Sequence, residues 1–174
     1  MNTLLNKLPY TEYCERQGSG DWNAEPINVV TAIALLISAY YIFKLLKKKN
    51  KINDKKFIFL PLLLAASAFS NVIYHTLPNP IAYLVDVVPL GLFWLIISYL
   101  LLLLGNKIKK IKGLLFIFLG FIVAVYLRSL DPVICNNFTI GSHFVLHIFI
   151  AVAAYYAVKS LLTIYGPEKN KKSF

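Results

Sequence analysis

Charge is scarce in this chain: only 15% of its 174 residues are charged, and eight of them are acidic. Soluble domains usually have about a quarter of their residues charged and about half apolar. Here 58% are hydrophobic and the mean hydropathy is +0.64. Alternating ten-residue strands, which would indicate a membrane barrel, are lacking. Continuous apolar runs of about 20 residues predict an all-α, polytopic transmembrane helix bundle instead.

Five apolar segments are long enough to cross a bilayer. We expect helices over Ile27–Leu46, Phe57–Leu77, Ile81–Leu104, Gly113–Leu130 and Gly141–Tyr165. A proline within the third segment, Pro89, should kink that helix. Residues 1–26 form a polar segment before the bundle of residues 27–166, and residues 167–174 form a basic tail. The first segment lacks an apolar region and an A-x-A site, so we expect no signal peptide.

The net charge of +10 is concentrated in three basic clusters beside the apolar segments, Lys44–Lys56, Lys107–Lys112 and Lys159–Lys172. They lack the interleaved exposed aromatics of a nucleic-acid surface, so no nucleic-acid partner is expected. The positive-inside rule makes all three cytoplasmic, with the N-terminus outside and the C-terminus inside. Frequent Lys, Asn and Ile suggest an AT-rich microbial genome. In a bacterium the membrane would be the cytoplasmic one.

Histidine is also scarce, and the predicted orientation places all three histidines, with Asp86, near the outer ends of their segments. His143 and His147 are four residues apart, as are Asn71 and His75, so each pair shares a helix face. Such a histidine pair and a third imidazole can hold zinc and leave one tetrahedral position open, the pattern of a catalytic site. Asp86 can then act as the general-base or supporting carboxylate of zinc hydrolysis.

Three other interpretations of these residues remain open at this point. Each histidine can simply hydrogen-bond across a helix interface. Haem ligation by two histidines is another, but it leaves His75 and Asp86 unexplained. A proton relay in a transporter also uses intramembrane histidine and aspartate, although five spans without an internal repeat argue against a transporter.

The polar N-terminal segment contains a second group of potential metal ligands. Their side-chain oxygens can bind a hard cation such as Ca²⁺, which prefers six to eight oxygen ligands. The alternative is a solvated acidic segment beside the membrane. The residues concerned are Glu12, Glu15, Gln17 and Glu25.

Cysteine occurs twice, as Cys14 and Cys135. The predicted topology places both on the outer side, where disulfides persist in oxidising compartments. A bridge between them would connect the N-terminal segment to the loop before the last span.

Three patches of the sequence resemble the alkaline ceramidase family, within the CREST superfamily of membrane hydrolases and adiponectin-receptor-like proteins. The first patch is Tyr13–Arg16 followed by Trp22–Asn28. The second is Asn71–His75 followed by Asp86–Pro89, and the third is Gly141–His147. Together they cover about a quarter of the chain, in the order and spacing of the family. The resemblance implies a zinc-dependent hydrolase that cleaves the amide bond of an N-acyl sphingolipid such as ceramide.

The resemblance also implies roles for particular residues. Zinc would be held by His75, His143 and His147, with Asp86 as the family's aspartate and a disulfide between Cys14 and Cys135. Calcium would be held by Glu12, the Tyr13 carbonyl, Glu15, Gln17 and Glu25.

The sequence departs from the family in two ways. Asn71 replaces the serine four residues before the first histidine, and Ser70 points about 100° away around the helix. Asn71 can still donate an N–H to an oxyanion. The family has seven spans and this chain has five, which leaves the pocket open to lipid or closed by a second protomer. A lipid esterase or phospholipase, and a lipid-binding or receptor-like protein without turnover, are the alternative functions.

Overall fold

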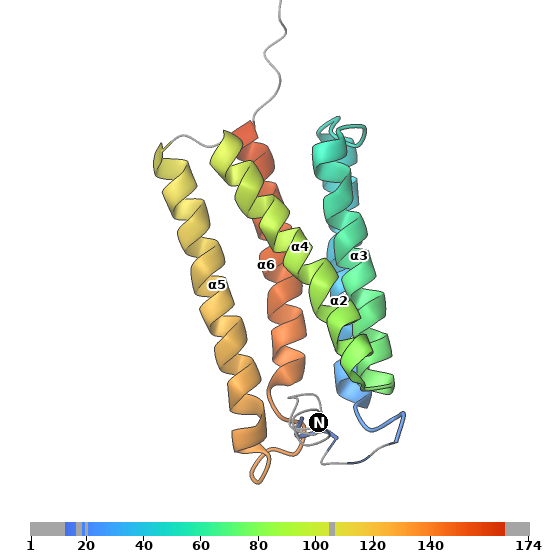
Figure 1. Ribbon diagram of the computed structural model, residues 1–174. Coiled ribbons are helices and arrows are strands. Elements are labelled where there is room, and N and C mark those ends of the chain that lie inside the picture. The colour runs from blue at the N-terminus through green and yellow to red at the C-terminus, as the bar shows by residue number, and fades with distance from the viewer. Residues whose placement is uncertain (1–12, 17–18, 20, 105–106, 166–174) are drawn as a thin grey trace, which may run out of the picture.

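The computed structural model describes residues 13–16, 19, 21–104 and 107–165. This part of the chain forms helices α2 (Pro26–Lys48), α3 (Lys55–Thr76), α4 (Pro80–Leu104), α5 (Lys107–Ile134) and α6 (His143–Tyr165) (Figure 1). Each contains a stretch long and apolar enough to cross a membrane. The expected all-α membrane architecture is therefore confirmed for the described residues.

The helix starts follow from local capping chemistry. Pro26 and Pro80 occupy the first helical positions of α2 and α4, where a missing N–H costs nothing. The Asn79 side chain accepts hydrogen bonds from two amides of the first turn of α4, at 3.0 and 2.9 Å. Asp54 caps α3 in the same way with one bond of 3.1 Å. Pro89 lies inside α4, and the helix continues through it.

The apolar core is formed by α2, α3, α4 and α6. Ile42 of α2, Leu64 of α3, Ile97 of α4 and Leu161 of α6 are completely buried in it. Helix α5 lies at the edge of the bundle beside α6 (Figure 1), and none of its apolar membrane stretch is buried. We infer that lipid covers this helix, because its exposed side chains are almost all apolar.

Helix α5 is longer than the sequence predicted. We expected Gly113–Leu130, but the helix begins at Lys107 and ends at Ile134. Lysine is a good helix former, so its basic cluster extends the helix beyond the apolar stretch. At the other end, Asp131 and Pro132 belong to the last turns of the helix rather than to a loop. Asp131 is consequently buried, with 1% of its surface exposed.

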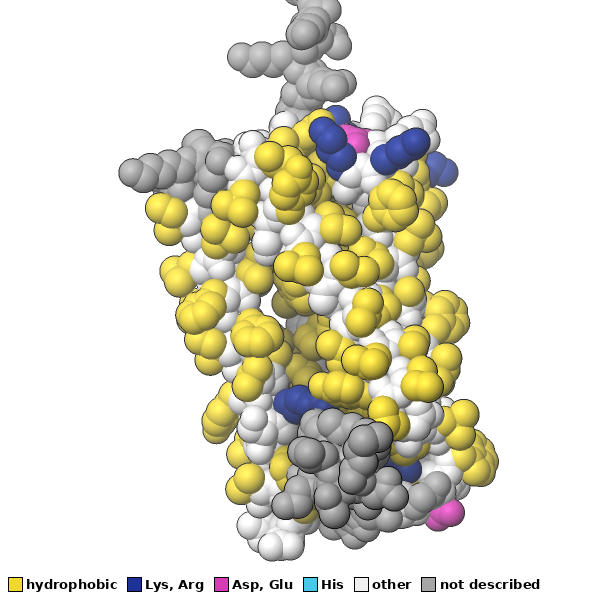
Figure 2. Space-filling view, in the orientation of Figure 1, with side chains coloured by type: hydrophobic (Ala, Val, Ile, Leu, Met, Phe, Trp, Pro, Cys, Tyr) yellow, Lys and Arg dark blue, Asp and Glu magenta, His cyan; other side chains and the backbone are white. Residues whose placement is uncertain are grey.

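The two ends of the bundle differ in charge. Figure 2 shows most of the visible Lys and Arg side chains at the end opposite the N-terminal segment. The last turn of α3 and the first turn of α6 both lie at the N-terminal segment's end (Figure 1). This charge asymmetry is the basis of the predicted orientation, which stays a prediction.

Candidate metal centre

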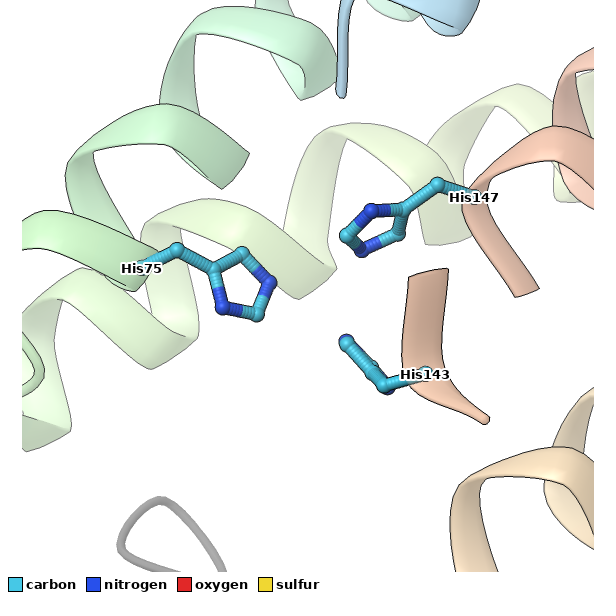
Figure 3. Close-up of side chains that lie close together, drawn as sticks. All are labelled: His75, His143 and His147. Carbon is cyan, nitrogen blue, oxygen red and sulfur yellow. The ribbon is translucent and has the colours of Figure 1, made fainter. Parts of the chain in front are cut away.

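Three imidazole rings meet at the end of the bundle that carries the N-terminal segment. His75 comes from the last turn of α3, and His143 and His147 come from the first two turns of α6 (Figure 3). The ring centroids are 4.7 to 5.2 Å apart, and one potential ligand atom of each ring lies within 4.8 Å of the others. All three side chains are buried. The cluster that the sequence predicted is therefore formed, and it can hold a metal ion.

Glu25 fixes the ring of His75. A hydrogen bond joins Nδ1 of His75 to a carboxylate oxygen of Glu25. Because a carboxylate only accepts hydrogen bonds, Nδ1 carries the hydrogen and Nε2 keeps a free lone pair. Nε2 of His75 is buried and has no hydrogen-bond partner among the described residues. A metal-ligating histidine commonly has such a carboxylate on its second nitrogen.

His147 is held by two neighbouring helices. Its Nδ1 lies 3.0 Å from the Thr31 hydroxyl of α2. That hydroxyl also lies 2.8 Å from the Ile27 carbonyl and donates its hydrogen there, so it accepts from the imidazole. Nε2 of His147 therefore keeps its lone pair, and the amide nitrogen of Asn71 lies 3.3 Å from it. In His143, Nδ1 is buried without a partner.

The residues present fit a transition-metal ion. Two of the three rings bury a nitrogen with no partner, and such unsatisfied polar atoms are costly without a ligand. The third ring presents a lone pair that only a weak contact from Asn71 satisfies. Neutral imidazoles suit zinc, copper, iron and nickel rather than calcium or magnesium. The geometry thus supports a metal centre but does not specify which transition metal it holds.

Asn71 and Asp86 both lie beside the histidine cluster. Asn71 is one turn before His75 on α3, is buried, and has a side-chain oxygen without a partner. Asp86 is half-buried on α4, close to Asn71 and within electrostatic range of His75 and Arg128. The residues expected to act on a substrate are thus next to the residues expected to hold the metal.

Two carboxylates of the predicted calcium site accept hydrogen bonds from other parts of the protein. Glu25 accepts from Arg16 Nε at 2.5 Å and from His75. Burial acts to raise the pKa of Glu25, but these hydrogen bonds outweigh it and hold the pKa below its usual value. Glu15 accepts from two amides in the first turn of α2, at 2.5 and 3.0 Å. Burial raises the pKa of Glu15 despite these bonds.

Arg16 supplies the positive charge within this segment. Its guanidinium donates to the carbonyls of Ser19 at 3.0 Å, Asp21 at 3.2 Å and His75 at 2.8 Å, besides its pairing with Glu25. The Tyr13 carbonyl, an expected calcium ligand, accepts the Arg16 amide at 3.0 Å. Glu12 and Gln17 lie outside the described residues, so the calcium site stays a prediction.

The expected disulfide between Cys14 and Cys135 is present. It joins the N-terminal segment to the turn after α5. Tyr13, the neighbour of Cys14, is thereby brought over the cluster, with its ring centroid 4.2 Å from that of His143.

Asp131 organises the same region, which the sequence reasoning did not foresee. Its carboxylate accepts from the backbone amides of Cys14 at 2.9 Å, Ser142 at 2.5 Å and His143 at 2.8 Å. It thereby caps α6 and anchors the N-terminal segment with one side chain. Gly141 has a φ of +72°, and a Cβ there would collide with the side chains of Asp131 and Cys14. The sequence predicted Asp131 in the loop after the fourth span and Gly141 as the first residue of the last span, so it did not connect the two residues.

We expect Asp131→Asn to lower the free energy of unfolding by about 3 kcal/mol, because the amide group would face backbone N–H donors that are left unpaired. Thermal unfolding in a non-ionic detergent, followed by near-UV circular dichroism, measures the change. Asp54→Asn is the matched control, since Asp54 caps α3 with a single bond and should cost about 1 kcal/mol or less. Equal melting temperatures for the two variants would contradict the assigned role of Asp131.

The fold and site together define a helical membrane protein with a buried three-histidine centre. Comparison with protein-family models, with curated proteins and with solved structures found no match.

Proposed function

We propose that the protein is a zinc-dependent intramembrane hydrolase that cleaves the amide bond of an N-acyl, ceramide-like lipid. The observation that carries the proposal is the set of three buried imidazoles inside an apolar helix bundle, with lone pairs free for a metal. Intramembrane ionisable residues are expensive and usually functional. The likeness of the three sequence patches to alkaline ceramidases supports zinc and an N-acyl substrate.

A bound zinc ion would supply the activation of water and the polarisation of the acyl carbonyl. The protein's own residues supply the rest. Asp86 would take a proton from the water and pass it to the leaving amine. Asn71 would donate its amide N–H to the oxyanion. This role is supported by the Asn71 amide nitrogen, which lies 3.3 Å from Nε2 of His147.

An apolar groove of about 420 Å³ supports an acyl substrate. Its lining includes Ala34 and Ser38, which follow Thr31 by three and seven residues on α2, and Ala151, which follows His147 by four on α6. The groove therefore continues along the helix faces that begin at the Thr31 and His147 contact. The Ser38 hydroxyl in this lining donates a hydrogen bond to the Ala151 carbonyl at 2.7 Å.

The deciding experiment measures metal content and fatty-acid release by the purified protein, with Asp86→Asn as the test variant. We expect zinc in the wild type and in the variant, and a loss of hydrolysis by about 10²- to 10⁴-fold in the variant, as is typical for removal of a general base. Asp21→Asn, on the exposed part of the N-terminal segment, is the control and should keep full activity. Undiminished hydrolysis by Asp86→Asn, or full activity without zinc, would refute the mechanism.

The same assay separates the other candidates. A paired panel of amide and ester lipids distinguishes an amidohydrolase from a lipid esterase or phospholipase with the same site. A receptor-like protein without turnover is favoured by Asn71, which stands where the ceramidase family has serine. Bound zinc and lipid without product, and no gain of activity in Asn71→Ser, would establish that alternative.

A further inference from the structure

A second cluster of polar groups lies beside the histidines and has no part in the proposed hydrolysis. Arg128 of α5 lies over two aromatic rings, with its guanidinium carbon 5.6 Å from the Tyr13 centroid and 5.4 Å from that of Tyr83. Tyr74 of α3 completes the group, since its ring is 6.2 Å from Tyr13 and 5.7 Å from Tyr83. Four separate parts of the chain thus contribute to the cluster.

Three buried donors of the cluster have no acceptor in hydrogen-bonding position among the described residues. They are Nη2 of Arg128 and the hydroxyls of Tyr13 and Tyr74, and the two hydroxyls lie near each other without forming a well-oriented hydrogen bond. Tyr13 and Tyr74 have only 3% and 1% of their surface exposed, so water does not solvate them freely. An unsatisfied buried donor costs about 1–3 kcal/mol, and more when it is charged. A cluster that only stabilised the fold would not be expected to leave three such donors close together without acceptors.

Asp86 does not neutralise Arg128 as an ion-pair partner. The two interact electrostatically, but among the described residues only Arg16 and His75 lie within 4.0 Å of a carboxylate oxygen. Figure 2 shows a hollow between α5 and the rest of the bundle. Arg128 is the one basic residue in the half of α5 nearer the N-terminal segment.

We propose that Arg128, Tyr13 and Tyr74 bind the anionic oxygens of a lipid headgroup. A carboxylate or phosphate accepts from a guanidinium and from hydroxyls at once, and such charge-assisted bonds are about twice as strong as neutral ones. The aromatic rings around the guanidinium keep it in place and exclude water.

The position of this anion site specifies the substrate, a step that rests on the proposed hydrolysis. Tyr13 packs against His143, with centroids 4.2 Å apart, and Tyr74 is the chain neighbour of His75. The anion therefore lies about one side chain away from the metal centre. Among the N-acyl lipids of the proposed hydrolysis, the site therefore selects one with a negative charge close to the amide nitrogen, such as an N-acyl amino acid.

The test compares two lipids of the same size, N-oleoylglycine and its neutral amide N-oleoylglycinamide. Binding to the full chain is measured by isothermal titration calorimetry in dodecyl maltoside, after a chelator has removed metal so that no turnover occurs. We expect the acid to bind at least about tenfold more tightly than the amide. Equal dissociation constants would overturn the proposal.

Variants then test whether the cluster causes the preference for the acid over the amide. Arg128→Gln should abolish the preference while the affinity for N-oleoylglycinamide stays within about twofold. Tyr74→Phe removes only an unpartnered hydroxyl, so it should weaken acid binding by about threefold or more without lowering the melting temperature. Tyr126→Phe, on the exposed face of α5, is the control and should change nothing. A preference that survives both Arg128→Gln and Tyr74→Phe would refute the assignment.

A competition experiment tests whether the bound anion comes from bulk phospholipid or from an N-acyl substrate. A hydrolysis assay then separates the anion site from the proposed hydrolysis. If dioleoyl phosphatidylglycerol displaces N-oleoylglycine at equal concentration, the site binds bulk phospholipid and the substrate assignment is wrong. If the acid binds preferentially but the metal-loaded protein releases no oleate from it, the anion site stands and the proposed hydrolysis fails. If the protein binds both lipids equally and hydrolyses N-oleoylglycinamide as fast as N-oleoylglycine, the proposed hydrolysis stands and the anion site is refuted.

Discussion

Replacement of His143 by alanine is expected to abolish both zinc binding and hydrolysis. The imidazole contributes one of three nitrogens to the cluster, and no other described histidine, cysteine or carboxylate belongs to this group of potential ligands. Two remaining nitrogens cannot complete a catalytic zinc site, which normally has three protein ligands. We expect zinc to fall from about one ion per chain to a small fraction of that. Fatty-acid release should fall by about 10³-fold or more.

The measurement is metal analysis by mass spectrometry together with the lipid assay on protein purified without added chelator. Val145→Ala is the matched control, because Val145 lies two residues along the same helix and is 40% exposed. Its zinc content and activity should equal those of the wild type. His75→Ala and His147→Ala should behave like His143→Ala, since the three nitrogens act as one set. Wild-type zinc content in any of the three alanine variants would remove that histidine from the site.

Glu25→Gln is expected to destabilise the protein and weaken metal binding at the same time. The carboxylate lies between the Arg16 guanidinium and Nδ1 of His75, and it also accepts from the Asn28 side chain at 3.0 Å. Both Glu25 and Arg16 are almost completely buried. Loss of one partner of a buried ion pair typically costs about 3–5 kcal/mol, because the other charge is left uncompensated.

The effect on the metal arises through His75. Glutamine has a single uncharged oxygen for the donors of Arg16, Asn28 and His75, so Nδ1 of His75 loses the carboxylate that fixes its tautomer and ring orientation. Loss of such a supporting group typically lowers metal affinity by about 10–100-fold. Zinc titration against a chromogenic chelator and thermal unfolding in detergent measure the two effects separately. Asp21→Asn, at an exposed position of the same segment, should change stability by less than about 0.5 kcal/mol. An unchanged zinc affinity in Glu25→Gln would show that the carboxylate stabilises the fold alone.

Only some of the contacts between distant parts of the chain in this site could be predicted from the sequence. His143 and His147 are close in the sequence, and helical periodicity alone places them on one face. Charge patterning predicted that the end of α3 and the start of α6 lie on the same side of the membrane, and on that basis His75 was grouped with them. No periodicity or charge pattern shows which carboxylate reaches His75, since Glu25 is 50 residues away along the chain. The sequence therefore predicted Asp86 as the carboxylate beside the metal centre and described Glu25 as a calcium ligand.

Asp131 illustrates the same limit for the fold. Next to Pro132, an aspartate is typical of a loop, and the predicted span ended before it. Its buried position depends on amides supplied by Cys14 and by the first turn of α6. Arg128 lies within the predicted span Gly113–Leu130, and only the packing of α5 beside the tyrosines shows that its Nη2 lacks a partner among the described residues.

By itself, the sequence determined that this is a five-span helical membrane protein with three histidines at one end, because hydrophobic length and helical period are local properties. Only the tertiary structure decided which side chains contact one another at that end of the bundle. It placed Glu25 beside His75, Asp131 between two backbone segments and Arg128 over the rings of Tyr13 and Tyr83. These contacts join residues far apart in the chain, and their energies depend on burial and hydrogen-bond partners that exist only once the helices have packed.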